Sequence, residues 1–137
     1  MVVNHRIMRL LVAFGFGALL SVGSYQWLTD TERSVRRAKE EAVVTASRSI
    51  LMAYIDSDNL AVSDALDRVR EAGKVYVFPT DRGWELSGYY QRAGEKIWHD
   101  YLMQLDNDLR LERFVVNDDD ARLRTLAESD PRFTAAN

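Results

Sequence analysis

The feature that most constrains this chain is an apolar run near its N-terminus. Between Leu10 and Thr29 the only ionisable side chain is that of Tyr25, and most residues are Leu, Val, Ala, Phe or Gly. A helix of about 20 residues is about 30 Å long, which matches the hydrocarbon core of a bilayer. Burying such a helix inside a soluble domain would need more chain than the 137 residues provide. The run therefore predicts a transmembrane anchor over residues 10–29.

Residues that favour the membrane–water interface flank this run. Arg6 and Arg9 precede it, and Tyr25 and Trp27 stand at its far end, where amphipathic rings favour the head-group level. The basic residues on the N-terminal side favour a cytoplasmic N-terminus, although the Arg and Lys residues of 33–39 oppose that orientation. We therefore expect a single-pass protein of the inner (cytoplasmic) membrane whose C-terminal domain is extracytoplasmic, that is, periplasmic.

A cleavable secretory signal is the alternative interpretation of the N-terminus. The basic start and the apolar run are followed by Val22, Gly23 and Ser24, which are small residues of the kind that a signal peptidase requires. Apolar character nevertheless continues past that point, through residues 25–28. We therefore favour an uncleaved signal-anchor.

Small residues recur within the predicted anchor. Ala13, Gly17 and Ser21 are spaced four residues apart and share one face of a helix. Small residues at this spacing let two membrane helices approach closely, although they are also common in any membrane helix. This face is the expected contact for self-association or for packing on the helix of another subunit.

Beyond the anchor the sequence predicts an α+β protein. Residues 31–55 contain neither Pro nor Gly, and their apolar residues recur at helical spacing, which predicts that the membrane helix continues into a helical stalk. The expected organisation is an N-terminal tail (1–9), a transmembrane anchor (10–29), a helical stalk (30–56), a small α+β domain (57–128) and a C-terminal tail (129–137).

Within the small domain the expected order is α-β-β-α, then a further strand or a continuation of the helix, then α. Helices are predicted over 60–72, which Gly73 ends, and over 94–109, because apolar residues share one face of each segment. A turn at residues 79–83 between two aromatic-rich segments predicts a β-hairpin. The remaining expected elements are strands at 74–78 and 84–90, a strand or helical continuation at 111–116, and a short helix at 121–128.

Composition argues against several functional classes. The chain has no Cys, which excludes disulfides, thiolate nucleophiles and Cys-ligated metals. Its net charge of −3 argues against a nucleic-acid partner. His5 and His99 have no second His at a metal-ligand spacing, and the carboxylates of residues 118–120 suit the N-terminus of a helix. We therefore expect no catalytic residues, no metal and no cofactor.

Aromatic residues gather around the predicted hairpin. Half of the aromatic residues in the chain lie between positions 76 and 101. In the second strand Trp84, Leu86 and Tyr90 point to one face, which predicts a core face because aromatic side chains bury large areas. We expect this face to pack on the following helix, through Trp98, Leu102 and Leu105.

The opposite face of the hairpin is the candidate binding surface. Tyr89 points away from the core face, beside either Tyr76 and Phe78 or Val75 and Val77, depending on the register of the first strand. Rings on a rigid strand bind a partner at little entropic cost. Tyr76, Phe78 and Tyr89 are therefore the candidate partner-binding residues.

Two functions fit this layout. One anchor, a helical stalk and a compact α/β domain make the chain similar in layout to the inner-membrane alignment subunits of pilus and secretion machines. This similarity implies a structural or assembly subunit that contacts membrane lipid and other protein subunits. The alternative is a ligand-sensing ectodomain, since a long membrane-proximal helix that leads into strands resembles extracytoplasmic sensors of the Cache kind, acting here through a partner.

Overall fold

The computed structural model describes residues 5–55 and 59–136, and within the first helix it describes side chains from Ala18 onward, apart from Leu19 and Gln26. The chain is α+β, and it divides into two compact units, Met1–Ala38 and Lys39–Asn137. Its elements in order are α1 (His5–Ile55), β1 (Leu60–Ser63), β2 (Tyr76–Pro79), β3 (Gly83–Arg92), β4 (His99–Asp106), β5 (Leu111–Asn117), α2 (Ala121–Ser129) and β6 (Phe133–Ala136).

Helix α1 is continuous over 51 residues, so the helix expected over 31–55 is present. Because this segment contains no Pro, every backbone N–H can donate within the helix. Several Ser and Thr hydroxyls also donate to the carbonyl one turn earlier, as in the 2.8 Å hydrogen bond from Thr31 to Trp27. Such bonds satisfy polar side chains without interrupting the helix.

The N-terminal half of α1 carries the predicted anchor. Among the described residues no helix is both long and apolar enough to cross a membrane. The side chains of the expected interface residues Arg6 and Arg9, and of the packing residues Ala13 and Gly17, lie outside those that the structure describes. The other expected residues are exposed, namely Ser21, Tyr25 and Trp27.

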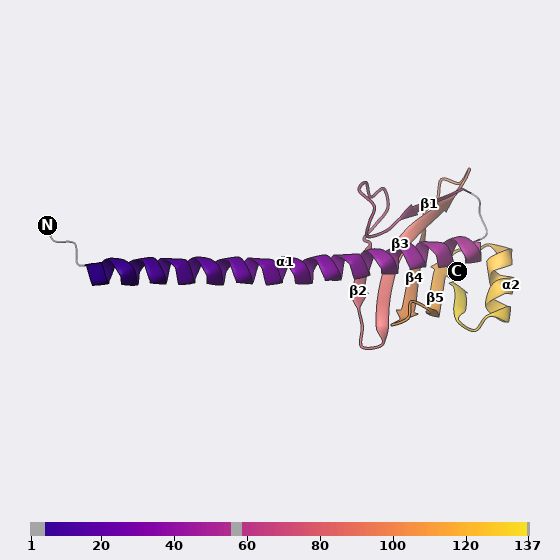
Figure 1. Cartoon of the computed structure of the whole chain (residues 1–137). Helices are drawn as coiled ribbons and strands as arrows, with labels where there is room; N and C mark the ends of the chain where they lie inside the picture. The colour runs from indigo at the N-terminus through magenta and orange to yellow at the C-terminus, as the bar shows by residue number, and fades with distance from the viewer. Residues whose placement is uncertain (1–4, 56–58, 137) are drawn as a thin grey trace. The chain divides into compact units, whose positions relative to one another are not determined.

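A six-stranded sheet forms the centre of the unit Lys39–Asn137 (Figure 1). The strand order is β1-β3-β4-β5-β6, and β2 pairs with β3 beyond the end of β1. All neighbouring strands are antiparallel except β5 and β6, which are parallel. A parallel pair needs a crossover connection, and α2 supplies it.

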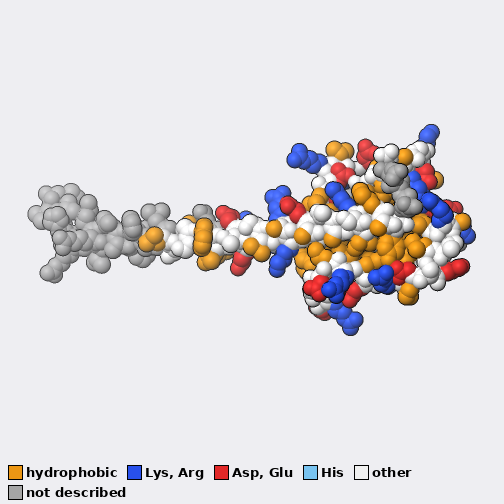
Figure 2. Space-filling model, turned by 45° about the vertical axis from the view of Figure 1, so that its right-hand side comes forward, with side chains coloured by type: hydrophobic (Ala, Val, Ile, Leu, Met, Phe, Trp, Pro, Cys, Tyr) orange, Lys and Arg blue, Asp and Glu red, His pale blue; other side chains and the backbone are white. Residues whose placement is uncertain are grey.

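One face of the sheet, called here the inner face, is covered by the last turns of α1. The packing against this face includes a cluster of three rings, Phe114, Phe133 and Tyr54, whose centroids lie 5.2–5.4 Å apart in edge-to-face and tilted arrangements. Figure 2 shows hydrophobic side chains gathered along the helix in this region. The buried core consists of Val43, Val44, Leu51 and Ile55 from α1, Leu123 from α2, and Leu86, Tyr90, Tyr101, Met103, Leu105, Phe114, Val116 and Phe133 from the sheet.

The helix predicted over 94–109 is wrong, because residues 99–106 form strand β4 instead. Tyr101, Met103 and Leu105 are buried while their neighbours are partly exposed, which is the two-residue period of a strand. Apolar residues here satisfy both the helical and the strand period, so the sequence pattern was ambiguous. Continuous pairing with β3, from Tyr90↔His99 to Gly83↔Asp106, favours the strand.

The helix predicted over 60–72 is also wrong. Residues 60–63 form β1, which pairs with the end of β3. The Asp64 side chain then accepts a 2.9 Å hydrogen bond from the backbone N–H of Leu66, which makes a turn that competes with a helix. Residues 56–58, which directly precede this segment, lie outside the described residues.

The predicted hairpin and the short C-terminal helix are confirmed. Strands β2 and β3 pair from Tyr76↔Ser87 to Pro79↔Trp84. Residues 111–116, for which a strand or a helix was open, belong to strand β5. Asp120 caps α2 by accepting a hydrogen bond from the Arg122 N–H.

The segment 129–137, which was expected to be a C-terminal tail, contains a strand of the sheet. Residues 133–136 form strand β6, in register with β5 from Phe114↔Phe133 to Asn117↔Ala136. Phe133 is only 2% exposed, so it belongs to the core. A four-residue strand beside a Pro carries too weak a local pattern to be recognised, and its pairing partner is brought to it by α2.

Candidate functional site

The candidate binding residues Tyr76 and Phe78 lie together on the face of the sheet opposite α1, called here the outer face. Tyr76 is opposite Ser87 and Phe78 is opposite Glu85 in the β2–β3 pairing. Of the two registers considered from the sequence, the observed one therefore places Tyr76 and Phe78, and not Val75 and Val77, on the face that carries Tyr89. Their rings stack with centroids 5.1 Å apart and planes at 25°. They remain 38% and 41% exposed, so the pair forms an apolar surface that water contacts.

Tyr89 is on the same outer face but is partly covered. A Cβ atom at Gly73 would lie 2.1 Å from the Tyr89 hydroxyl oxygen, so the backbone of the β1–β2 connection passes directly over the ring. Only Gly can stand at that position without moving the ring. Tyr89 therefore supports the loop beside the aromatic pair, and its half-buried ring offers less contact surface than Tyr76 or Phe78.

Polar groups border the aromatic pair and fix its orientation. The Tyr76 hydroxyl donates a 3.2 Å hydrogen bond to one oxygen of Glu85, and the Gln104 amide donates a 2.9 Å bond to the other. Partial burial and the nearby Glu85 carboxylate raise the pKa of Tyr76 above its ordinary value. The pair is thus an apolar patch with a satisfied polar rim, which is the usual composition of a protein-binding surface.

The predicted core face of β3 is confirmed, with a different partner. Leu86 and Tyr90 are buried, whereas Trp84 is half-buried. The partner expected was a helix presenting Trp98, Leu102 and Leu105. Only Leu105 lies on the inner face of β4, opposite Trp84; the half-buried Leu102 is on the outer face and Trp98 precedes the strand.

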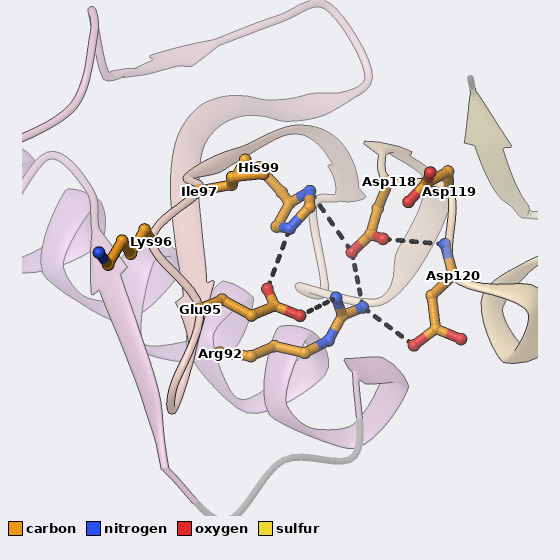
Figure 3. A pocket seen from close by; sticks show the side chains of 8 residues that line it. All are labelled: Arg92, Glu95, Lys96, Ile97, His99, Asp118, Asp119 and Asp120. Carbon is orange, nitrogen blue, oxygen red and sulfur yellow. Dashed lines mark hydrogen bonds and ion pairs between the residues drawn. The ribbon is translucent and has the colours of Figure 1, made fainter.

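A second candidate site was not predicted from the sequence. It is an open pocket of about 490 Å³ between the β3–β4 loop and the residues that precede α2 (Figure 3). Seven of its eight lining side chains are ionisable or charged, and acidic groups predominate. The lining residues are Arg92, Glu95, Lys96, Ile97, His99, Asp118, Asp119 and Asp120.

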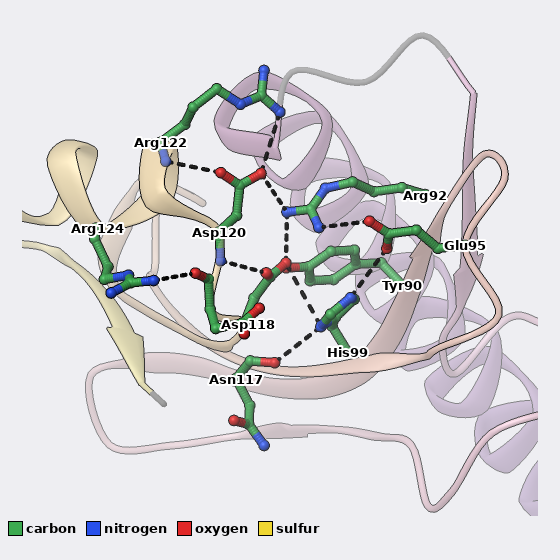
Figure 4. Close-up of polar contacts among 10 residues, drawn as sticks. Tyr90, Arg92, Glu95, His99, Asn117, Asp118, Asp120, Arg122 and Arg124 are labelled. Carbon is green, nitrogen blue, oxygen red and sulfur yellow. Dashed lines mark hydrogen bonds and ion pairs between the residues drawn. The ribbon is translucent and has the colours of Figure 1, made fainter.

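Asp118 is the centre of this pocket's hydrogen-bond network (Figure 4). One of its oxygens accepts from the Tyr90 hydroxyl at 2.5 Å and from the Arg92 guanidinium at 2.6 Å, and the other accepts from the Asp120 N–H at 3.0 Å. Burial by itself would raise the pKa of Asp118, but these donors outweigh it and lower the pKa. Burial, together with the bond to Asp118, raises the pKa of Tyr90.

His99 closes the network from the opposite side. Its Nε2 lies 3.2 Å from a Glu95 oxygen, and its Nδ1 lies 3.2 Å from the Asn117 carbonyl and 3.7 Å from Asp118. The imidazole also stacks on Tyr90, with ring centroids 5.3 Å apart. His99 thus does not lie on the helix predicted over 94–109: it is the first residue of β4, where pairing with β3 places it beside Asp118.

The chemistry available in this pocket is limited by its internal pairing. Arg92 contacts Glu95, Asp118 and Asp120 at 2.6–3.5 Å, so its positive charge is already matched by carboxylates. Among the side chains that the structure describes, no group of three or more His, Cys, Asp or Glu is arranged to hold a metal ion. The sequence signal for the pocket was the acidic run at residues 118–120, which also caps α2.

Comparison with known proteins adds no assignment. The chain matches no known family model, no curated protein and no solved structure. The sites described above are therefore interpreted from their geometry and chemistry.

Proposed function

We propose that this chain is a single-pass membrane-anchored structural or assembly subunit whose extracytoplasmic α+β domain binds other protein subunits. The observation that carries the proposal is the stacked, exposed pair Tyr76 and Phe78 on the outer face of the sheet. Aromatic side chains dominate binding energy in protein interfaces, and a ring held on a strand loses little entropy on binding. Both helices contribute to the inner-face core, which leaves this aromatic surface available to a partner.

The membrane assignment in this proposal rests on the amino-acid sequence. The run from Leu10 to Thr29 lacks charged side chains, Arg6 and Arg9 precede it, and Tyr25 and Trp27 stand within its C-terminal end. The small-residue face Ala13, Gly17 and Ser21 would pack on the helix of a second copy or another subunit. A continuous α1 suits this arrangement, because a membrane helix that runs on as a stalk needs no connecting loop.

A ligand-sensing domain is the alternative function, and the pocket around His99 and Asp118 is the observation that favours it. Its volume of about 490 Å³ lies in the range of small-molecule sites. Asp118 already pairs with Arg92 at 2.6 Å, however, and His99 Nδ1 lies 3.7 Å from the same carboxylate, so a ligand would have to replace existing contacts. A partner that binds Tyr76 and Phe78 would not have to replace any existing contact of this kind. The assembly function is therefore the better supported of the two.

Copurification of the full-length chain from detergent distinguishes the two functions. We expect a stable complex with other subunits, which is lost when Tyr76 and Phe78 are both changed to Ala. Ile97→Ala is the matched control, because Ile97 is 67% exposed but lines the pocket. A chain that purifies alone with a bound small molecule, and loses it in the Ile97 variant, would instead establish the sensor.

Cysteine labelling tests the membrane topology, and the natural chain contains no Cys to interfere. In intact cells we expect an impermeant maleimide to label Ser129→Cys and to label Asn4→Cys only after lysis. Labelling of Asn4→Cys alone would reverse the topology. Equal labelling of both variants in the soluble fraction would exclude the anchor.

A further inference from the structure

The β4–β5 turn holds a leucine in a backbone conformation that leucine rarely adopts. Leu109 has φ of 61°, and it is the one non-glycine residue among those described with a positive φ. In this left-handed region the Cβ atom of an L-residue approaches the backbone closely, so Gly or Asn is the usual choice. Such a residue persists only where the surrounding structure holds it there.

Hydrogen bonds within the turn account for the backbone path but not for the choice of leucine. The Asp106 N–H donates to the Arg110 carbonyl at 2.9 Å, and the Leu109 N–H donates to the Asp106 carbonyl at 3.0 Å. One carboxylate oxygen of Asp106 also accepts from the N–H groups of Asp108 and Arg110, each at 2.8 Å. All of these bonds involve main-chain N–H groups at position 109 or its neighbours, and Gly at 109 would form them without strain.

The leucine side chain provides the reason for the unusual residue. Leu109 packs against the buried core cluster, and with Trp84 it lines a small cavity of about 260 Å³ beside α1. The α1 residues on this cavity are Lys39, Ala42 and Val43. Val43, at 1% exposure, is the first buried residue of α1 among the side chains that the structure describes. Leu109 thus lies where the burial of α1 begins.

We propose that Leu109 is a positioning residue that clamps the first buried turn of α1 onto the sheet, and that the strained turn is maintained for this contact. The apolar contact of Leu109 with the core offsets the conformational cost of its backbone. The clamp determines the residue at which α1 becomes protected by the sheet. The clamp also couples the β4–β5 turn to α1. If the apolar contact of Leu109 is lost, nothing offsets the conformational cost of its backbone, and the turn is destabilised.

Hydrogen exchange and melting of the full-length chain in detergent test this proposal. Leu109→Ala removes the side chain but keeps the strain, whereas Leu109→Gly removes both. In Leu109→Ala we expect amides 43–47 to exchange about tenfold faster than in the wild type, relative to amides 51–55. We also expect Leu109→Gly to melt about 4–8 °C above Leu109→Ala, because glycine adopts this conformation freely.

Two further variants serve as controls for the hydrogen-exchange experiment. Leu126→Ala removes an apolar side chain that packs on the same core from an ordinary helix, so it should not raise exchange at 43–47 selectively. Leu109→Met keeps a long apolar side chain and should preserve the protection of these amides. The proposal is overturned if Leu126→Ala reproduces the selective effect, if Leu109→Met loses protection as Leu109→Ala does, or if Leu109→Gly melts no higher than Leu109→Ala.

Discussion

The two faces of the same sheet differ in what covers them. On the inner face, Leu86, Tyr101, Met103 and Phe114 are at most 3% exposed beneath α1. On the outer face, Tyr76 and Phe78 stack on each other, partly exposed, beside the polar side chains of Glu85 and Gln104. Both faces carry aromatic rings, so aromatic content alone does not distinguish core from surface.

Whether an aromatic ring belongs to the core or to the surface depends on the segment that packs over its face of the sheet, and not on the strand that carries the ring. Successive residues of a strand point to opposite faces, so β3 supplies Tyr90 to the core and Tyr89 to the outer face. Tyr90 is buried and donates to Asp118, whereas the half-buried ring of Tyr89 lies against the loop at Gly73. If this holds, substitutions on the inner face should mainly lower stability, and substitutions on the outer face should mainly weaken binding.

Phe114→Ala should have the largest effect. Phe114 is fully buried, and its ring contacts those of Tyr54, Tyr101 and Phe133. Removing it leaves a cavity in the centre of the inner-face core, at an expected cost of about 3–5 kcal/mol in the free energy of unfolding. Urea denaturation measures this change, and a loss below about 1 kcal/mol would contradict the assigned core.

Trp84→Ala should have an intermediate effect, because Trp84 is on the inner face but only half-buried. Its ring packs against the core from beside the cavity that Leu109 lines. We expect a loss of about 2 kcal/mol, roughly half of what a fully buried aromatic ring would give. If Trp84→Ala destabilises the protein as strongly as Phe114→Ala, the Trp84 ring is fully buried in solution, and the half-buried position assigned to it is wrong.

Asp118→Asn should lower stability and flatten its dependence on acid pH. Because the folded pKa of Asp118 is lowered, its ionised form stabilises the fold above its unfolded pKa of about 3.9. This contribution is lost as pH falls through the folded pKa. We expect a loss of about 1–3 kcal/mol at neutral pH, since Arg92 and Tyr90 lose a charged acceptor.

The comparison of wild type with variant isolates Asp118 from the other carboxylates. Asp120 and Asp130 also have lowered pKa values, through hydrogen bonds from the Arg122 backbone and the Arg132 side chain respectively. Asp130 therefore destabilises both proteins in acid alike, whereas Asp120 shares Arg92 with Asp118 and is counted as part of the Asp118 network. Equal slopes of unfolding free energy against pH, below about pH 4, would show that the Asp118 network contributes nothing to the acid response.

Phe78→Ala should have the smallest effect on stability and the largest effect on binding. Its ring is 41% exposed, stacks on Tyr76 and is not part of the buried core, so we expect a change within about 0.5 kcal/mol. Copurification of partner subunits should nevertheless fall sharply. If Phe78→Ala destabilises the protein by as much as Trp84→Ala while binding is retained, the outer face is a second core and not a binding surface.

The confirmed predictions are those whose signals are local in the chain. The helix over 31–55 lacks breakers, the hairpin has aromatic strands around the turn at residues 79–83, and Asp120 stands where a helix cap is needed. The alternation of β3 correctly separated Leu86 and Tyr90 from Tyr89. Each of these patterns lies within one element, so it can be recognised without knowing the neighbours of that element.

The wrong predictions are those that depended on pairing across the chain. The apolar residues of 99–106 fit both the helical and the strand period. These residues form a strand because they make eight residue pairs with β3. β1 and β6 are short, and each is specified by a partner far away in the sequence. The polar pocket could not be predicted either, because Arg92, His99 and Asp118 come from separate segments that the sheet brings together.

The long helix, the α+β class, the hairpin and the alternation that separates the two faces of β3 could all be predicted from the amino-acid sequence. Those features follow from propensity and periodicity, which act over a few residues. Three features depend on the packing of the whole domain: the face of the sheet that α1 covers, the pairing of residues 99–106 as a strand, and the left-handed conformation of Leu109. These outcomes depend on contacts between distant segments, whose combined burial and hydrogen bonding outweigh the local preference of any single residue.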